Sequence, residues 1–506
     1  MELIDNLALG FEVALSPTTL LYCLIGVTFG TFVGVLPGIG PLATIGLLLP
    51  ITFHLPPTEA IVMLAGIYYG AMYGGSTTAI LLNLPGTAAS VMVALDGHQM
   101  AKQGRAGPAL VMTTIVSFAA ACVAILVIAA FAPPLAQFAT RFTSAEYFSL
   151  MIMGLIAASV LVSGSLVKGL AMTVLGLLLG MVGQDVTTGE ARYTFGLLQL
   201  YDGLHFVIVI IGLFGLAEVI NNLAQGEKRQ QFTQKVPWRD LIPTRKDLHD
   251  SFTSTVRGTG LGAALGILPG AGPAISTFAA YAVEKRVSKD PSQFGRGSIK
   301  GVTAPEAANN AAAQTSFIPT LSLGVPGDAT MALMLGAMMI HGLVPGPQII
   351  QNNPDFFWGL VASFWIGNLL LLILNLPMVG IWIKMLSIPY RWMFPAILTF
   401  IGIGMYSLHM EGFDVFVAAG FGLVGYLFIK LRCEAAPLLL GLILSPLVEE
   451  NLRRALLVSR GELSIFVERP ISLVFLILGV GFFLAVVIPG IVKALKPKPA
   501  DTTDGR

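Results

Sequence analysis

Charged side chains are scarce in this chain of 506 residues. Asp, Glu, Lys and Arg make up 11% of it, against about 25% in soluble globular proteins. Hydrophobic residues make up 55%, so the sequence predicts an all-α polytopic membrane protein. The formal net charge of +1 offers no bulk attraction to nucleic acid. The three cysteines stand alone in the sequence, without the spacing of a metal site or a disulfide framework.

The sequence also lacks a phosphate-binding loop and basic residues near its N-terminus, and each absence excludes one expectation about the protein. The sequence has no Gly-x-x-x-x-Gly-Lys-Ser/Thr phosphate loop, so we do not expect ATP hydrolysis by this chain to drive its activity. The first Lys or Arg is Lys102, and Glu2, Asp5 and Glu12 precede the first apolar run. A cleavable signal peptide begins with basic residues, so we expect no cleaved targeting segment.

A six-residue motif, Leu-Pro-Gly-x-Gly-Pro, occurs twice. It spans residues 36–41 and returns 232 residues later at 268–273, and each copy follows three glycines spaced four residues apart. Small residues at this spacing let helices pack closely in lipid, so we interpret these glycines as packing positions. The Pro and Gly residues of the motif interrupt a helix. Helices broken at matching positions of a duplicated chain are typical of secondary transporters.

Two more pairs of motifs match in the same order. Residues 83–88 correspond to 324–329, and the Gly-Pro at 107–108 corresponds to that at 346–347. A polar, basic stretch lies between the halves, and basic loops stay in the cytoplasm. The predicted organisation is an N-terminal membrane repeat, a basic cytoplasmic linker, a C-terminal membrane repeat and a polar cytoplasmic tail, at 1–224, 225–257, 258–490 and 491–506.

The first break in each half predicts a re-entrant hairpin. In the second half the two apolar arms, 258–268 and 273–283, have 11 residues each, whereas a span needs about 20. Basic residues flank this hairpin, so we expect it to enter from the cytoplasm. The first hairpin, 18–53, has no basic flank, so we expect it to enter from the opposite, non-cytoplasmic side of the membrane.

The predicted fold therefore has two inverted-topology repeats, each with a re-entrant hairpin and a second broken helix, plus about nine plain transmembrane helices. The orientation of the rear helices is left open. Segments 175–185 and 440–450 are alike in sequence, but the span count places them in the same orientation.

The breaks supply candidate substrate-binding residues. Each break starts a new helix, whose unpaired N–H groups and positive dipole end favour an anion. Hydroxyls, amides and freed carbonyls near the second breaks suit a carboxylate and a small cation. The alternative for each Ser or Thr is a hydrogen bond within its own helix. The candidates are Gly38, Gly40, Thr44, Asn83, Gly86, Thr87, Gly270, Gly272, Ser276, Thr277, Gly327 and Thr330.

The candidates for the coupling ion are Asn309, Asn310 and Asp328. Ionisable residues within membrane segments are costly and default to functional roles, which also singles out Glu306. In the alternative interpretation, Asp328 caps the helix after the break and Glu306 lies at the cytoplasmic interface. The isolated histidines share no spacing, so we expect no metal site beyond a possible Na⁺.

Two other classes of protein compete with a carrier. A passive channel would show uncoupled flux, whereas a carrier saturates and needs a gradient. An intramembrane aspartyl protease is suggested by Tyr201-Asp202 and Gly327-Asp328, but both pairs sit at segment ends and their surrounding residues do not fit. Repeat symmetry with two kinds of break favours the carrier.

Four motifs together resemble one family, the large membrane subunit of the tripartite tricarboxylate transporters. They lie at residues 34–41, 69–76, 83–86 and 304–310. The resemblance implies a multi-pass carrier of the bacterial inner membrane, not an enzyme and without a cofactor. It further implies import of citrate or related organic carboxylates on a Na⁺ or H⁺ gradient, with a small four-span membrane subunit and a periplasmic solute-binding protein as partners. We expect an elevator-like movement of the broken helices against a scaffold of plain spans.

Overall fold

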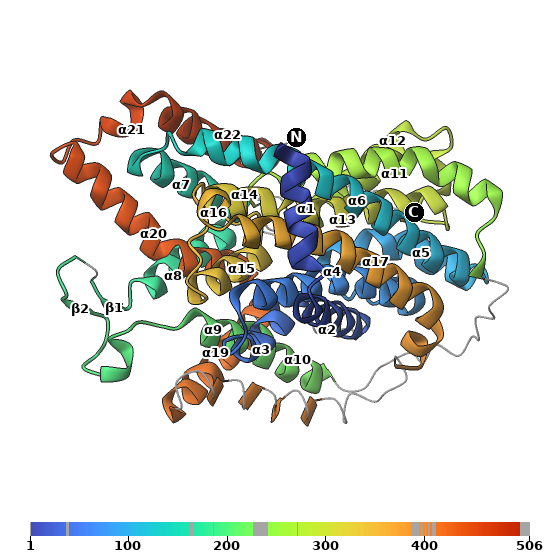
Figure 1. Cartoon of the computed structure of the whole chain (residues 1–506), viewed down its shortest axis with the longest axis horizontal. Coiled ribbons are helices and arrows are strands. Elements are labelled where there is room, and N and C mark those ends of the chain that lie inside the picture. The colour runs from blue at the N-terminus through green and yellow to red at the C-terminus, as the bar shows by residue number, and fades with distance from the viewer. Residues whose placement is uncertain are drawn as a thin grey trace, which may run out of the picture.

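The chain is built almost entirely of helices (Figure 1). The computed structural model describes residues 2–36, 40–160, 165–185, 187–225, 241–270, 272–385 and 411–495, with the short pieces 394–395, 398–399, 401–402 and 405–406. Gly38, residues 226–240 of the linker and most of the tail therefore lie outside the described residues.

The elements of the first half are α1 (Glu2–Ala14), α2 (Pro17–Val35), α3 (Pro41–Thr52), α4 (Pro57–Leu82), η1 (Ala88–Ser90), α5 (Val91–Lys102), α6 (Ala106–Ala139), α7 (Ser144–Val160), α8 (Leu166–Gly180), β1 (Gly183–Gln184), β2 (Ala191–Arg192), η2 (Leu198–Leu200), α9 (Phe206–Ile210), η3 (Ile211–Leu216) and α10 (Ala217–Gln225). The two strands form a short antiparallel pair.

The elements of the second half are α11 (Arg245–Gly266), α12 (Gly272–Val287), η5 (Pro291–Gln293), α13 (Ile299–Thr315), α14 (Phe317–Leu323), α15 (Ala329–Ile340), α16 (Ile349–Asn352), α17 (Pro354–Met385), α19 (Gly412–Leu431), α20 (Ala436–Val458), α21 (Ile465–Glu468) and α22 (Pro470–Leu495). Helix α11 begins inside the stretch that we assigned to the linker.

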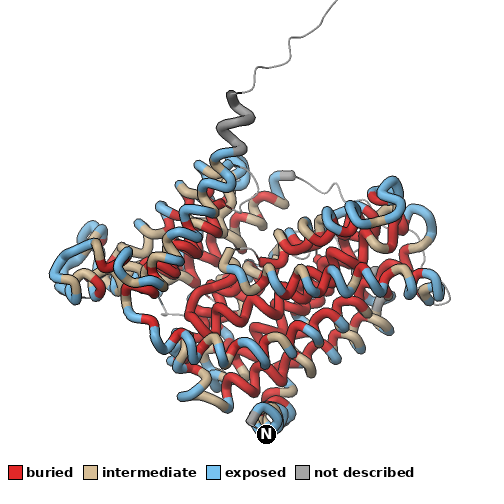
Figure 2. Tube along the Cα trace, turned by 90° about the horizontal axis from the view of Figure 1, so that it is seen from above, coloured by how far each residue is buried: buried red, intermediate tan, exposed pale blue. Residues whose placement is uncertain are grey.

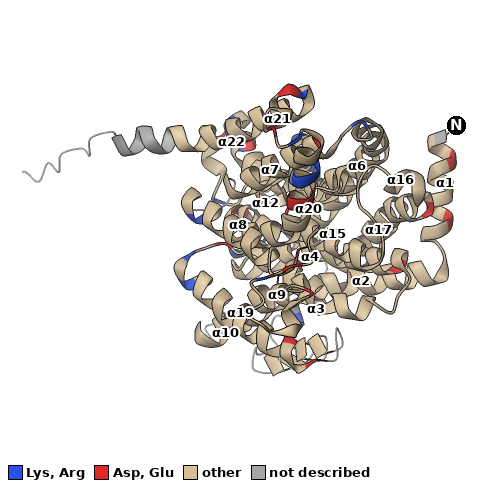
Figure 3. Ribbon diagram, turned by 90° about the vertical axis from the view of Figure 1, so that its left-hand side faces the viewer, with Lys and Arg blue, Asp and Glu red and all other residues tan. Residues whose placement is uncertain are grey.

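Six helices among the described residues are long and apolar enough to cross a membrane, which confirms an all-α polytopic membrane protein. They are Pro17–Val35, Ala106–Ala139, Phe206–Ala224, Pro354–Met378, Gly412–Leu431 and Pro470–Ile488. Long stretches of the ribbon carry no charge (Figure 3), and the buried core runs through the centre of the molecule (Figure 2).

Five of the nine plain spans that we expected coincide with these long helices. The expected spans at 147–163 and 167–183 are the shorter helices α7 and α8. The span expected at 435–449 is the first part of α20, and that at 393–408 lies mostly outside the described residues. Helix α2 has 19 residues and qualifies as a span, whereas α3 has only 12, so a re-entrant first hairpin stays a prediction.

Each glycine ladder packs its helix against the helix that leads to the second break. A Cβ added to Gly30 of α2 would lie 2.5 Å from the carbonyl oxygen of Ile67 in α4. A Cβ added to Gly262 of α11 would lie 2.3 Å from that of Ala308 in α13. No side chain fits between these backbones, so the ladder glycines serve close packing.

The second breaks adopt the same backbone conformation. Helix α4 ends at Asn83 (φ 55°, ψ 31°) and α14 ends at Gly324 (φ 68°, ψ 22°), both left-handed. Four residues later, Thr87 and Asp328 each precede the next helical turn. A left-handed residue followed by proline stops a helix and turns the chain.

Helix α8 packs against the first part of α20 at one end of the molecule, near the protruding β1–β2 hairpin (Figure 1). A Cβ on Gly176 would meet Leu438, and one on Gly180 would meet Ser445. Beyond the helix pair, Arg453 binds Asp185 at 2.5 Å. The two segments that we found alike in sequence therefore pack against each other.

Candidate functional site

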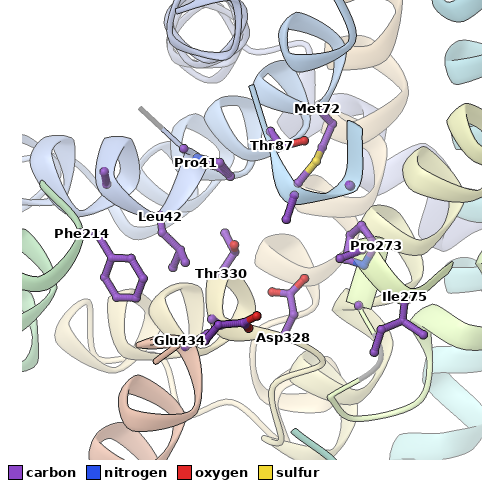
Figure 4. A pocket seen from close by; sticks show the side chains of 18 of the residues that line it. Pro41, Leu42, Met72, Thr87, Phe214, Pro273, Ile275, Asp328, Thr330 and Glu434 are labelled. Atoms are coloured by element: carbon purple, nitrogen blue, oxygen red, sulfur yellow. The ribbon is translucent and has the colours of Figure 1, made fainter. Parts of the chain in front are cut away.

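The first and second breaks of both halves meet at one cavity of ≈ 540 Å³ (Figure 4). Its wall is formed by residues 40–43 and 85–89 of the first half and by 272–275 and 328–330 of the second. Segments that are far apart in the sequence thus come together at one cavity.

Three helices begin at the wall of this cavity. Helix α3 starts at Pro41 after Gly40, α12 starts at Gly272, and α15 starts after Asp328. The first N–H groups of a helix have no partner within it and carry its positive dipole end. The starts of α3 and α12 therefore present backbone donors to an anion, whereas the first N–H groups of α15 are capped by Asp328.

Asp328 serves its own helix as well as the cavity. Its Oδ1 accepts the backbone N–H of Met331 at 2.8 Å, which caps α15. Its Oδ2 accepts the hydroxyl of Tyr68 from α4 at 2.9 Å. The capping alternative is thus observed, while the carboxyl group still lines the cavity, where Figure 4 shows it beside Thr330.

The two breaks of the second half are tied directly to each other. The N–H of Gly270 donates to the carbonyl oxygen of Gly327 at 2.7 Å. Gly270 has φ +83°, and an added Cβ would lie 2.6 Å from the nitrogen of Ala158 in α7. Only glycine fits this turn, so Gly270 shapes the cavity wall and Gly327 holds it in place.

The charged side chains of the wall are all acidic. Besides Asp328 they are Glu218 of α10 and Glu434 before α20, and Asn222 donates to Glu218 at 3.3 Å. Among the described residues that line the cavity there is no Lys or Arg. An anion bound here would therefore meet backbone dipoles and no basic side chain of the described lining.

Seven of the predicted residues line the cavity: Gly40, Gly86, Thr87, Gly270, Gly272, Asp328 and Thr330. Three predicted hydroxyls do not, because each bonds within its own helix. Thr44 donates to Gly40 at 3.0 Å, Ser276 to Gly272 at 2.9 Å, and Thr277 to Ala274 at 2.7 Å. This is the intrahelical alternative, and it leaves these side chains supporting the first turns of α3 and α12. Asn83 is exposed at the left-handed end of α4.

The paired amides on α13 differ from each other. Both Asn309 and Asn310 are buried. The amide nitrogen of Asn310 donates to Ser117 and to Glu306, whereas neither side-chain polar atom of Asn309 has a hydrogen-bond partner among the described residues. A buried polar group without a partner needs an explanation. Asn309 is therefore the amide of this pair that is free to bind an ion.

Sequence reasoning missed the acidic wall contributed by α10 and the start of α20. Glu218 lies inside an apolar run that qualifies as a span, and an ionisable residue in such a run was a usable signal. Glu434 follows Cys433 in a loop and gave no such signal.

Fold and cavity together define a multi-pass membrane protein with interrupted helices around an internal site. The sequence matches the Tripartite tricarboxylate transporter TctA family over residues 20–440. The chain belongs to this family and is a subunit of a tripartite tricarboxylate transporter, which confirms the resemblance seen in the motifs.

Two relatives come from Agrobacterium vitis. One, described as "Uncharacterized 52.8 kDa protein in TAR-I ttuC' 3'region", is 51% identical over 491 residues, which is 97% of each chain. The other, "Uncharacterized protein in TAR-II ttuC' 3'region", is 53% identical over 230 residues, covering 46% of this chain and 95% of its own. No solved structure matches.

Proposed function

We propose that this chain carries organic carboxylates, citrate or a related acid, across the bacterial inner membrane by symport with Na⁺ or H⁺. A small four-span membrane subunit and a periplasmic binding protein that delivers the substrate complete the transporter. The observation that carries the proposal is the convergence of three helix N-termini on one cavity built from both halves.

Backbone N–H groups would hold the carboxylates of the substrate. The first turns at Gly40 and Gly272 supply donors from opposite halves of the chain, and Thr87 and Thr330 add hydroxyls. Such donors are fixed in place before the substrate arrives, so they need no buried basic side chain.

The acidic wall supports coupling to a cation. A di- or tricarboxylate that approaches Glu218, Asp328 and Glu434 brings more negative charge to an already negative site. Cations that enter with the substrate would remove this repulsion. Asn309 and Asp328 are our candidates for holding the coupling ion, and Asn310 would act through Glu306.

Alternating access would follow from an inverted pair of repeats, as in other carriers with broken helices at the midplane. We propose that the hairpins and second breaks move together, in an elevator-like step, against the plain spans. The direct contact between Gly270 and Gly327 supports such a unit, because it joins a hairpin to a second break.

The variant Gly40→Leu tests the site. Gly40 lines the cavity, and a Cβ added there meets nothing within 4 Å, so the leucine should fill the cavity without disturbing the fold. We expect uptake of radiolabelled citrate, malate and succinate to be lost in proteoliposomes that hold all three components. Membrane insertion should be unchanged.

Gly260→Leu is the matched control. Gly260 also has open space around an added Cβ, but it does not line the cavity, so this variant should transport as the parent does. Uptake by Gly40→Leu equal to that of the parent would refute the site. A channel would equilibrate substrate without a Na⁺ or H⁺ gradient, whereas the proposed carrier accumulates it only when such a gradient is imposed.

A further inference from the structure

A fully buried carboxyl group, that of Glu306 on α13, joins the two halves of the chain outside the cavity lining. Ser76 of α4 bonds its Oε2 at 2.5 Å, and Ser117 of α6 donates to its Oε1 at 2.8 Å. Asn310, one turn later on α13, donates to Oε1 at 3.1 Å. All three partners are neutral, so none of them balances a negative charge.

The hydrogen bonds define where a proton can sit on this carboxyl group. The amide nitrogen of Asn310 also donates to the Ser117 oxygen at 2.7 Å, which leaves the Ser117 hydrogen for Oε1. Oε1 of Glu306 therefore accepts the Ser117 hydroxyl, and it shares the second Asn310 amide hydrogen with the backbone carbonyl oxygen of Glu306 at 3.1 Å. Within the described part of the chain, Oε2 has one partner, the Ser76 hydroxyl, which can donate to a carboxylate or accept from a carboxylic acid. The position for a proton is Oε2.

This neighbourhood does not suit a metal cation. Hard cations are bound by oxygen lone pairs, but Asn310 and Ser117 turn hydrogens toward Glu306. Among the described residues, no ion pair involves Glu306. A buried charge without a partner is strongly disfavoured, and binding a proton removes it.

Other ionisable groups near Glu306 do not supply a charge that would balance its carboxylate. Tyr73 of α4 and Cys122 of α6 lie in the same neighbourhood, and both side-chain types are ordinarily neutral near pH 7. On other helices packed against α13, Asp96 of α5 accepts the Tyr281 hydroxyl, and Arg257 of α11 pairs with Glu284 of α12.

Ser76 connects the carboxyl group to the cavity wall. The residue before it, Gly75, accepts the N–H of Gly86 at 3.4 Å. A Cβ added to Gly75 would lie 3.0 Å from the methyl carbon of Thr87. Since Gly86 and Thr87 line the cavity, a displacement of that wall on substrate binding would be transmitted to Ser76 and Glu306.

We propose that Glu306 binds the proton that drives carboxylate transport, with the proton on Oε2 and hydrogen-bonded to Ser76. This inference rests on the proposed function and names its coupling ion as H⁺ bound by Glu306, in place of an ion held by Asn309 and Asp328. The step is a simple protonation: the carboxylate of Glu306 takes up H⁺ on the outer side and becomes a neutral acid while the carrier is loaded. It returns to a carboxylate, held by its three donors, when the proton leaves inside.

The test compares two modes of transport by Glu306→Gln in proteoliposomes that hold the complete transporter. The probe is whichever of radiolabelled citrate, malate and succinate the parent takes up best. Glutamine has the shape of the protonated acid but cannot release a proton. We expect exchange of internal for external substrate within about twofold of the parent, and accumulation driven by a pH gradient to fall to the equilibrium level. Glu462→Gln, at an exposed position, should retain both modes.

Ser76→Ala provides a second, independent measurement. It removes the one partner of Oε2 among the described residues, so the carboxylate is less well stabilised and the proton is held to higher pH. The pH of half-maximal uptake should therefore shift upward relative to the parent. A purely structural role for Ser76 would lower the rate without moving this profile.

The outcomes separate the two proposals. If the parent neither exchanges nor accumulates any of the three carboxylates, the proposed function fails. If the parent transports but Glu306→Gln accumulates substrate on a pH gradient as the parent does, only the assignment of the proton to Glu306 fails. A Ser76→Ala profile that coincides with that of the parent would also overturn it.

Discussion

Replacing Gly262 by alanine should push two helices of the second half apart. An added Cβ would lie 2.3 Å from the carbonyl oxygen of Ala308 and 2.6 Å from its Cα. Ordinary contact begins at 3.4 Å, so α11 must move away from α13 by the difference, 1.1 Å. Backbone atoms cannot rotate out of the way as a flexible side chain can.

The expected loss of stability can be estimated from the usual effect of overpacking a protein interior. Extra atoms in a tightly packed interior usually cost about 1–3 kcal/mol. Alanine also gains up to about 1 kcal/mol over glycine through its helix propensity, which offsets part of this. Gly260→Ala, on the same helix, receives the same gain, but its added Cβ has open space. The difference between the two variants should therefore be about 1–3 kcal/mol, with the propensity effect removed.

Thermal unfolding of the two purified variants in detergent measures this difference. Gly262→Ala should melt below the parent, and Gly260→Ala at or above it. If both variants melt at the same temperature, the ladder does not determine the spacing of α11 and α13, and the argument from close approach is refuted.

Two further predictions concern the pH dependence of an ion pair and the side of the membrane on which two loops lie. The N–H groups of Thr188 and Thr187, together with Arg453, hold the pKa of Asp185 well below its usual range. The ionised Asp185 therefore stabilises the fold above the pKa that it has in the unfolded chain, and this stabilisation is lost on acidification. The difference in melting temperature between the parent and Asp185→Asn should be largest at pH 7 and shrink below about pH 4. A difference that stays constant with pH would contradict this. Cysteines placed singly at the exposed positions Lys102 and Asn352, in a background without the native cysteines, should react with an impermeant thiol reagent from opposite sides of the membrane; labelling from one side would disprove the inverted orientation.

The positions of the breaks could be predicted because local chemistry determines them. Proline cannot donate a hydrogen bond and glycine accepts left-handed backbone angles, so Gly270 interrupts a helix wherever the chain goes. The ladder glycines were equally predictable as packing positions, since only a missing side chain permits the backbone contact seen at Gly30. These properties reside in a few consecutive residues.

The partners of polar side chains could not be predicted in the same way. Thr44, Ser276 and Thr277 had two outcomes, a ligand contact or a bond to the preceding turn, and the choice depends on which way each helix face points in the folded protein. Glu306 had been placed at an interface in one interpretation, and only the folded structure shows that its side chain is buried among α4, α6 and α13.

By itself, the sequence determined the class of protein, its family, the breaks and the glycine contacts, because composition and short motifs encode them directly. Only the tertiary structure decided which segments share a cavity and what charge its wall carries. Glu218 and Glu434 are more than 200 residues apart in the chain, and they line the same cavity because α10 and the start of α20 fold against the broken helices. Long-range packing of this kind has no local signal, since it depends on how all the apolar faces are buried at once.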